Sequence, residues 1–239
     1  MVSKNELKLI TSLHQKKYRN KHELFIAEGI KGVLELLESK LLPYALYVTQ
    51  EVDGLPIGNT VKIGAGEMKK LSCLKTPTEI LGVFHMPEQK SLKTEGIILA
   101  LNNVRDPGNL GTIIRLCDWF GISQLVCSVN TVDCYNPKVV QATMGSLARV
   151  QINYLELEDF LISTDKPIYG AIMDGENVYK SKLPKEAILV MGNESNGIGT
   201  SILHKVSNRL SIPRFGSQQT ESLNVATATA ILLSEFRRG

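Results

Sequence analysis

The sequence predicts an α/β protein with an open, mostly parallel sheet in its C-terminal part and a smaller α/β domain before it. From Gly96 onward, short apolar runs typical of buried parallel strands alternate with segments whose apolar residues recur at helical spacing. This alternation favours a sheet with helices on both faces. Hydrophobic residues make up 43% and charged residues 21% of the 239 residues, which argues against a disordered or coiled-coil chain.

The C-terminal elements are predicted from these runs. Strands are expected at Ile97–Leu101, Leu125–Val129, Ile152–Leu155, Ile168–Ile172, Ile188–Met191 and Leu210–Ile212. Helices are expected at Leu110–Phe120, Lys138–Arg149, Leu157–Ile162, Thr200–Val206 and Glu221–Phe236. Gly121 lies where a glycine would end the first of these helices.

The N-terminal part has a shorter pattern of the same kind. Ser3 and Glu6 have the spacing of a capping box and precede a helix with apolar residues at 7, 10 and 13. A second helical pattern covers 33–37, and further elements are expected as strands at Ala45–Val48, Val61–Ile63 and Ile80–Phe84 and a short helix at Met68–Leu74. The polar stretch 87–95 is interpreted as a linker, with a surface loop as the alternative, so we divide the chain into residues 1–90 and 91–239.

Charge is spread unevenly along the chain. The net charge of +3 is too small to indicate nucleic acid by itself. Residues 1–22, however, hold six basic residues against one acidic residue. Such a cluster is expected for phosphate binding, and a solvated helix face is the alternative. We take Lys16, Lys17 and Arg19 as candidate contacts to the phosphates of a nucleic acid.

Composition also disfavours several classes of protein. Apolar runs such as Ile97–Leu101 are far shorter than the ~20 residues of a membrane helix, so no membrane contact is expected. The first residues lack the apolar segment of a signal peptide, so we expect a cytoplasmic protein. The cysteines lack the spacing of zinc ligands, so we expect reduced thiols and no metal site at Cys73, Cys117, Cys127 and Cys134.

Three C-terminal segments carry clustered polar residues, each where a strand gives way to a loop or helix. In open α/β sheets this edge is where ligands bind. The first segment runs from Asn102 to Arg115 and contains an Asp-Pro-Gly-Asn turn, after which Asn109 is a natural N-cap. Arg115 stands among apolar residues and therefore needs an anionic or polar partner. Trp119, further along the same helix, is expected to pack in the core.

The second segment, 188–199, is a buried strand followed by a glycine-bearing loop. Gly192 and Gly197 have the spacing of a P-loop, but the required Lys-Ser/Thr pair is missing. The segment also lacks G-x-G-x-x-G, which disfavours a nicotinamide-dependent enzyme. Glu194, just past the strand, is either an acid at a helix start or a functional carboxylate.

The third segment, 210–228, leads from a strand into a closing helix rich in small residues. Ser222 and Asn224 are placed to cap that helix. Taken alone, this segment indicates no specific chemistry.

Taken in order, the motifs N-x-x-D-P-x-N-x-G-x-x-x-R, G-N-E-x-x-G and I-P…S-L-N-V resemble the SpoU/TrmH family of SPOUT-class RNA methyltransferases, over about residues 97–237. The run Leu24–Gly29 and its surroundings resemble the L30e-like substrate-binding domain of that family. The resemblance implies a trefoil knot that binds S-adenosylmethionine, a homodimer, and methylation of RNA ribose 2′-hydroxyls. The added N-terminal domain favours ribosomal RNA over transfer RNA.

The resemblance also assigns candidate residues by position. The polar active-site set is Asn109, Arg115, Glu194, Ser222 and Asn224, and the cofactor-lining set is Gly192, Ile212 and Leu223. Arg214 stands where the family more often has methionine, and the loop from 216 to 222 is longer than in many relatives.

A chemical role can be assigned to two of these residues. A guanidinium is a poor base, so we expect Arg115 to stabilise the developing alkoxide, with Glu194 holding Arg115 or helping to accept the proton. The alternatives are a transfer RNA 2′-O-methyltransferase, an enzyme that methylates a base nitrogen, and a non-catalytic RNA-binding or ribosome-assembly protein that kept the fold.

Overall fold

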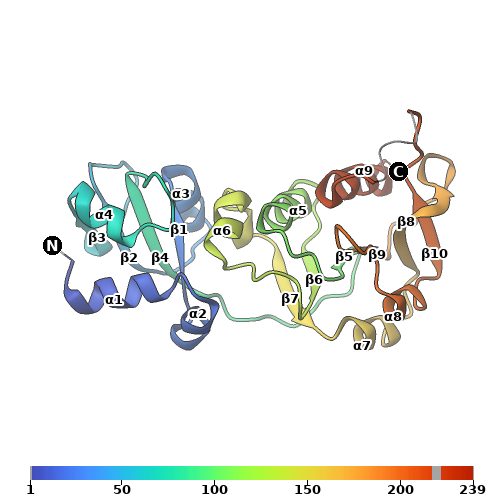
Figure 1. The fold of residues 1–239 in the computed structure, drawn as a ribbon, viewed down its shortest axis with the longest axis horizontal. Helices are drawn as coiled ribbons and strands as arrows, with labels where there is room; N and C mark the ends of the chain where they lie inside the picture. Colours follow the sequence, from blue (N-terminus) through green and yellow to red (C-terminus); the bar gives the residue numbers. More distant parts are fainter. Residues whose placement is uncertain (1, 217–221, 239) are drawn as a thin grey trace. The chain divides into compact units, whose positions relative to one another are not determined.

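The structure is a computed structural model that describes residues 2–216 and 222–238, and the chain divides into two compact units (Figure 1). Unit 1 contains Met1–Glu88 and Asp133–Arg149, and unit 2 contains Gln89–Val132 and Val150–Gly239. The cut after residue 88 lies in the expected linker. The segment Asp133–Arg149, which the sequence pattern placed in the second domain, packs with unit 1 instead.

Unit 2 is built around a six-stranded sheet, whose strand order is β10-β8-β9-β5-β6-β7. Every pair of neighbouring strands in it is parallel. The strands are β5 (Ile97–Leu101), β6 (Gln124–Ser128), β7 (Gln151–Leu155), β8 (Ile168–Asn177), β9 (Ala187–Met191) and β10 (Asn208–Ser211). The prediction of a parallel α/β sheet is confirmed.

Helices cover both faces of this sheet. One face carries α5 (Pro107–Trp119) and α9 (Val225–Arg237), and the other carries α7 (Leu157–Ile162) and α8 (Thr200–Leu203) (Figure 1). A short 3-10 turn, η3 (Val178–Lys180), follows β8. Because both faces are covered, the central strands β5 and β9 are buried at every position, as their continuous apolar sequences indicate.

Unit 1 is a smaller sheet with helices around it. Its strand order is β1-β4-β2-β3, in which β4 is antiparallel to β1 and β2. Its strands are β1 (Leu24–Glu28), β2 (Pro43–Val48), β3 (Thr60–Lys62) and β4 (Ile80–His85). Its helices are α1 (Lys4–Ser12), α2 (Lys16–His22), α3 (Ile30–Glu38), α4 (Ala65–Leu71) and α6 (Pro137–Thr143), with the 3-10 turns η1 (Ile57–Asn59) and η2 (Ser146–Ala148).

The start of α1 agrees with its sequence signal. The Ser3 hydroxyl accepts from the Glu6 N–H at 3.2 Å, and the Glu6 carboxylate accepts from the Ser3 N–H at 2.9 Å. The apolar side of α1 then packs Ile10 and Leu13 with Met68 and Leu71 in one buried cluster against the sheet. The predicted capping box is confirmed.

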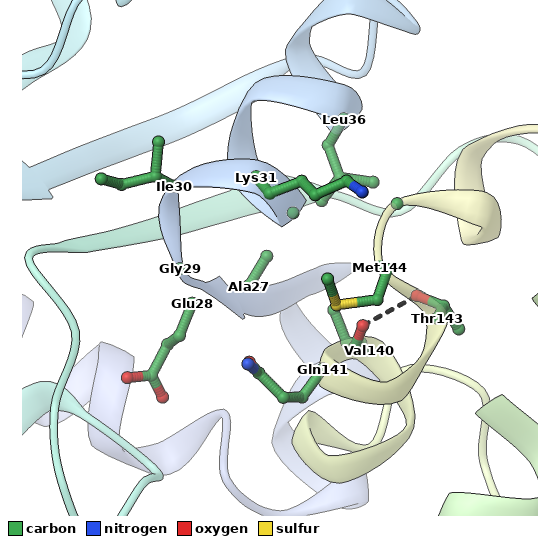
Figure 2. Close-up of a pocket in the computed structure, with 12 residues that line it drawn as sticks. Ala27, Glu28, Gly29, Ile30, Lys31, Leu36, Val140, Gln141, Thr143 and Met144 are labelled. Carbon is green, nitrogen blue, oxygen red and sulfur yellow. Dashed lines mark hydrogen bonds between the residues drawn. The ribbon is translucent and has the colours of Figure 1, made fainter. Parts of the chain in front are cut away.

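The helix predicted over Lys138–Arg149 is interrupted. It ends at Thr143 because Met144 and Gly145 take left-handed backbone conformations, with φ of 50° and 92°. A Cβ at Gly145 would lie 2.5 Å from the Glu35 side chain, so this turn packs directly against α3. Figure 2 shows the pocket between the start of α3 and the end of α6, with Gln141 and Met144 among the side chains around it.

The expectation that Trp119 packs in the core is wrong, because its side chain is 84% exposed. The buried stripe of α5 runs through Leu110, Ile113, Ile114 and Cys117, at the i, i+3, i+4, i+7 spacing of one helix face. Trp119 lies off that stripe. Gly121, with φ of 65°, follows the end of α5 as predicted.

Three expectations from the sequence concern the knot, membrane helices and metal sites. The segment that would complete the knot includes residues 217–221. These residues, like the predicted helix start at Glu221, lie outside the described residues. The knot stays a prediction. None of the helices in the described parts of the chain is long and apolar enough to cross a membrane. Within the same residues, no group of three or more His, Cys, Asp or Glu side chains is arranged to hold a metal ion.

Candidate active site

Three of the predicted site residues meet at the carboxyl edge of the unit 2 sheet. Asn109, in the first turn of α5, donates from Nδ2 to Oε1 of Glu194 at 2.9 Å. Asn224, just before α9, donates from Nδ2 to Oδ1 of Asn109 at 2.8 Å. Each residue comes from a different one of the three polar segments, so the fold joins side chains up to 115 positions apart in a continuous hydrogen-bonded chain.

The start of α9 fixes the direction of this chain. Asn224 is the N-cap of α9, and its Oδ1 accepts from the N–H groups of Ala226 at 2.9 Å and Thr227 at 3.2 Å. Because a backbone N–H only donates, the amide oxygen of Asn224 must face the helix and its amino group must face Asn109. Asn109 then directs its own amino group at Glu194. The Glu194 carboxylate is therefore the acceptor at the end of an ordered chain.

A third asparagine, Asn193, holds the loop that carries Glu194. Asn193 donates from Nδ2 to the Asn103 carbonyl at 2.7 Å, and the same nitrogen lies 3.3 Å from Oε2 of Glu194. Its Oδ1 accepts from the N–H groups of Ser195 and Asn196 at 2.9 and 3.2 Å. This side chain therefore both shapes the loop after β9 and ties it to the loop after β5.

The loop after β5 contributes one more tie. The Asn102 side chain is 6% exposed, and its Oδ1 accepts from the Gly199 N–H at 2.7 Å. No role for Asn102, Asn103 or Asn193 was predicted from the sequence. The available signal was the pair of asparagines directly after a buried strand, since amide side chains are well suited to joining neighbouring loops.

The prediction that Asn109 caps α5 is wrong. Asp106 is the N-cap, and its Oδ1 accepts from the Asn109 N–H at 2.8 Å. Pro107 takes the first helical position, where its fixed φ and missing N–H are favourable, and this places the cap one residue before it. Asn109 is thereby the third helical residue, and its side chain is left to reach Glu194 and Asn224.

Arg115 lies away from this chain. It follows Asn109 by six residues, which places it ~9 Å along the helix axis and about 240° around it. Its side chain is exposed and makes no hydrogen bond or ion pair with the residues that the structure describes. The apolar stripe of α5 lies on another face, so Arg115 is not set among apolar side chains as expected. Within the described part of one chain, Glu194 bonds to Asn109 and Asn193 and does not hold Arg115.

Comparison with known proteins decides the family. Residues 96–234, more than half of the chain, match the SpoU rRNA Methylase family. The chain belongs to this family. Residues 4–82 match the MRM3-like substrate binding domain. The predicted combination of a SpoU/TrmH domain with a preceding substrate-binding domain is confirmed.

Individual relatives of this SpoU protein cover nearly all of its length. It is 33% identical to the 23S rRNA (guanosine(2553)-2′-O)-methyltransferase RlmP of Bacillus subtilis over 233 residues, which is 94% of this chain and 93% of the relative. It is similar to the structure of a putative TrmH-family RNA methyltransferase from Porphyromonas gingivalis, with 39% identity and a TM-score of 0.89 over 100% and 99% of the two chains. An AdoMet-bound rRNA methyltransferase from Sinorhizobium meliloti matches with 28% identity and a TM-score of 0.86 over 100% and 97%.

In the SpoU domain, Gly192 is required by the backbone around it. A Cβ at this position would lie 2.2 Å from the Gly197 carbonyl carbon and 2.4 Å from the Ile198 nitrogen. The missing side chain lets Asn193 and Gly197 form a tight bridge with N···O distances of 2.8 and 2.9 Å. This bridge shapes the loop that carries Glu194.

The other cofactor candidates of the SpoU domain lie at the same edge. Gly192 follows β9 and Ile212 follows β10, and both strands are parallel to β8, which lies between them. Ile212 is half-buried, whereas Leu223, next to Asn224, is 48% exposed. Ser222 is exposed, and the described structure does not bring it into the Asn224–Asn109–Glu194 chain.

The substrate-binding domain corrects one of the three candidate RNA contacts. Lys16 and Lys17 are exposed on α2, but Arg19 is only 2% exposed. Its guanidinium pairs with Asp133 at 2.5 Å and donates from Nη1 to the Leu13 carbonyl at 2.9 Å and the His14 carbonyl at 3.1 Å. Position 19 faces inward on α2, so Arg19 holds unit 1 together instead of contacting RNA.

Proposed function

We propose that this chain transfers the methyl group of S-adenosylmethionine to a ribose 2′-hydroxyl of ribosomal RNA, in the cytoplasm. The observation that carries the proposal is the ordered Asn224–Asn109–Glu194 chain, which the three family segments build at the ligand-binding edge of the sheet. The Bacillus subtilis relative, a 23S rRNA 2′-O-methyltransferase, supports the same reaction and substrate. The Sinorhizobium meliloti relative supports the cofactor, because its structure contains AdoMet.

The residues at this edge fit the proposed cofactor. An adenosyl group needs apolar contacts and close approach of main chain, and the edge offers the partly exposed side chains of Ile212 and Leu223 beside the glycine-bearing loop at Gly192. Bound there, S-adenosylmethionine supplies an already activated methyl electrophile.

The task left to the side chains is to position the ribose hydroxyl and ease the loss of its proton. Glu194 is exposed, and two amide groups that donate to it fix the direction of its carboxylate. Its remaining lone pairs can accept from the 2′-hydroxyl. We assign Ser222, which is exposed beside Leu223, a further hydroxyl contact to the ribose of the bound RNA. In this scheme Asn109 and Asn224 are positioning residues that act through Glu194.

We also propose that a homodimer completes the site. α5 exposes both Arg115 and, one turn later, Trp119, whose ring is 84% exposed. Large exposed aromatic side chains are typical of interfaces, so α5 is the proposed contact with a second copy. Arg115 would then lie beside the site of the second copy, where its permanent charge stabilises the developing alkoxide and a neighbouring phosphate.

Isotope-labelled S-adenosylmethionine tests the proposal directly. The purified protein is incubated with unmodified 23S rRNA, 16S rRNA and transfer RNA, and the digested RNA is analysed for labelled nucleosides by mass spectrometry. A labelled 2′-O-methyl nucleoside from ribosomal RNA is expected. Label in transfer RNA would show that transfer RNA, and not ribosomal RNA, is the substrate. Label on a base would refute methylation of the ribose. Cofactor binding without any transfer, to free RNA or to ribosomal particles, would indicate a non-catalytic RNA-binding protein.

A further inference from the structure

A groove between α1 and α2 in unit 1 has a basic and polar lining. Its volume of about 630 Å³ is within the range of known ligand sites. The lining residues are Asn5, Lys8, Leu9, Thr11, Ser12, Gln15, Tyr18, Lys21 and His22. Neither the family motifs nor the proposed catalytic chain uses this surface.

Helical spacing explains why these residues share one surface. Positions 5, 8, 9 and 12 recur at i, i+3, i+4 and i+7, which is one face of α1, and positions 18, 21 and 22 form one face of α2. The core-facing side of α1 packs Ile10 and Leu13 with the sheet. The face of α1 that carries Asn5, Lys8 and Ser12, beside the half-buried Leu9, is therefore left to form a wall of the groove with α2.

Buried contacts hold the two helices at a fixed angle. The Arg19 guanidinium, on α2, donates to the carbonyl groups of Leu13 and His14 at the end of α1, and it is also paired with Asp133. The His14 ring nitrogen lies 3.1 Å from the Leu71 carbonyl of α4. A groove fixed in this way binds a ligand without first ordering its own walls.

The charge of the groove favours an anionic ligand. The lysines among residues 1–22 are all exposed, at positions 4, 8, 16, 17 and 21, and none of the groove-lining residues is acidic. Glu6, the acid within that stretch, caps α1 through Ser3 and accepts from the Tyr47 hydroxyl at 3.4 Å. The phosphates of a nucleic acid are suited to such a surface.

The ring of Tyr18 favours single-stranded over double-stranded nucleic acid as the ligand. Tyr18 is half-buried and lines the groove, with the Lys17 ammonium 5.8 Å from the ring centre. Aromatic rings beside lysines are the usual platform on which unpaired nucleobases stack, whereas the bases of a duplex are already stacked and unavailable.

We infer that the α1–α2 groove holds a single-stranded segment of the RNA substrate, with phosphates at Lys8 and Lys21 and a base against Tyr18. The inference rests on the proposed function for the identity of the ligand as substrate RNA. Arg19 takes part by positioning the two helices and makes no contact with the RNA.

Binding of the full-length protein to fluorescent RNA tests the inference. The probes are a short single-stranded oligonucleotide, the matching duplex and a 23S rRNA transcript, each titrated over a range of salt concentrations. The double variant Lys8→Ala/Lys21→Ala is expected to bind the single strand more weakly and to reduce the slope of log K against log salt by about 1.4, which corresponds to two phosphate contacts at ~0.7 each. Tyr18→Ala is expected to bind about tenfold more weakly, while Tyr18→Phe keeps the ring and binds nearly normally.

Two control variants test whether a loss of RNA binding comes from the groove or from elsewhere in unit 1. Lys62→Ala removes an exposed lysine from β3 of the same unit and is expected to leave affinity and salt slope unchanged. Lys31→Ala removes the lysine that lines the pocket in Figure 2. A loss of RNA binding in Lys31→Ala, together with normal binding in the groove variants, would place the RNA at that pocket and overturn the inference.

The inference and the proposed function fail in different ways. If the groove variants lose RNA affinity but the wild-type protein methylates no RNA, the proposed function is refuted and the groove assignment stands. If methylation occurs while the groove variants keep the wild-type affinity and salt slope, the groove assignment is refuted. Equal binding of duplex and single strand, or no RNA binding by the wild-type protein, also overturns it. Unchanged melting curves and S-adenosylmethionine affinity in all variants exclude loss of folding as the cause.

Discussion

Replacing Asn224 by aspartate separates the two tasks of this side chain, which caps α9 and donates to Asn109. The cap needs only an oxygen acceptor for the N–H groups of Ala226 and Thr227, and aspartate caps helices about as well as asparagine. We therefore expect Asn224→Asp to change the free energy of unfolding by less than ~0.5 kcal/mol. Asn224→Ala loses the cap and the bond to Asn109, which costs about 1–3 kcal/mol, or ~2–4 °C in melting temperature for each kcal/mol.

Asn224→Asp should impair methyl transfer strongly although it leaves the helix cap in place. In Asn224→Asp, an oxygen replaces the nitrogen that lies 2.8 Å from Oδ1 of Asn109, so two acceptors face each other. Rotating the Asn109 amide would relieve this clash but would turn its oxygen toward Oε1 of Glu194, now 2.9 Å from its nitrogen. The repulsion is moved along the chain, and Glu194 must shift. We expect a loss of ~100-fold in kcat, as when one positioned hydrogen bond of an active site is removed.

Single-turnover methylation and urea unfolding, run side by side, measure both effects. The double variant Asn224→Asp/Glu194→Gln supplies the control, because the new side-chain amide can donate to the rotated Asn109 oxygen. It is expected to restore the hydrogen bond between positions 109 and 194 without restoring methyl transfer. Wild-type turnover in Asn224→Asp, or equal stability of the aspartate and alanine variants, would refute the reasoning.

Other variants test the remaining parts of the site. Arg115→Ala should lower methyl transfer ~100-fold with unchanged cofactor affinity, and normal turnover would remove Arg115 from the mechanism. Trp119→Lys should halve the mass measured by light scattering, since the ring is 84% exposed in one chain and its loss should affect only the dimer contact; an unchanged mass would contradict that interface. Gly192→Ala should weaken S-adenosylmethionine binding at least ~tenfold in calorimetry because its Cβ would lie 2.2 Å from backbone, whereas Gly66→Ala, with nothing within 4 Å, should bind normally. Arg19→Met should cost ~3–5 kcal/mol in urea unfolding because it leaves the carboxylate of Asp133, only 12% exposed, without its charged partner, and a smaller cost would show that water reaches the pair.

Much of the fold could be predicted because it is encoded locally. Strand β5 and helix α7 lie at the predicted residues, since each has a continuous or helically spaced apolar pattern between loop signals. The glycine stop after α5 and the capping box before α1 follow from the backbone preferences of a few adjacent residues. The helix predicted through Gly145 failed where a left-handed turn, packed against Glu35, outweighed helical spacing.

Part of the site could also be predicted from the sequence. Parallel strands bring their carboxyl ends to one edge, so polar residues after β5 and β9 had to lie near each other. The sequence pattern did not say which side chains would bond. Asn109 was assigned to a cap that Asp106 makes, and Asn193 was assigned no role, because the choice between these partners depends on distances across the edge.

By itself, then, the sequence determined the α/β elements, the edge of the sheet that carries the polar segments, and the family motifs. Tertiary structure decided that Arg19 is buried, that Trp119 and Arg115 are exposed, and that the segment Asp133–Arg149 packs with unit 1. The physical reason is the separation along the chain over which each kind of interaction acts. Periodicity shows that a helix has an apolar face, but which side chain meets a partner more than a hundred residues away depends on how the whole chain closes around its cores.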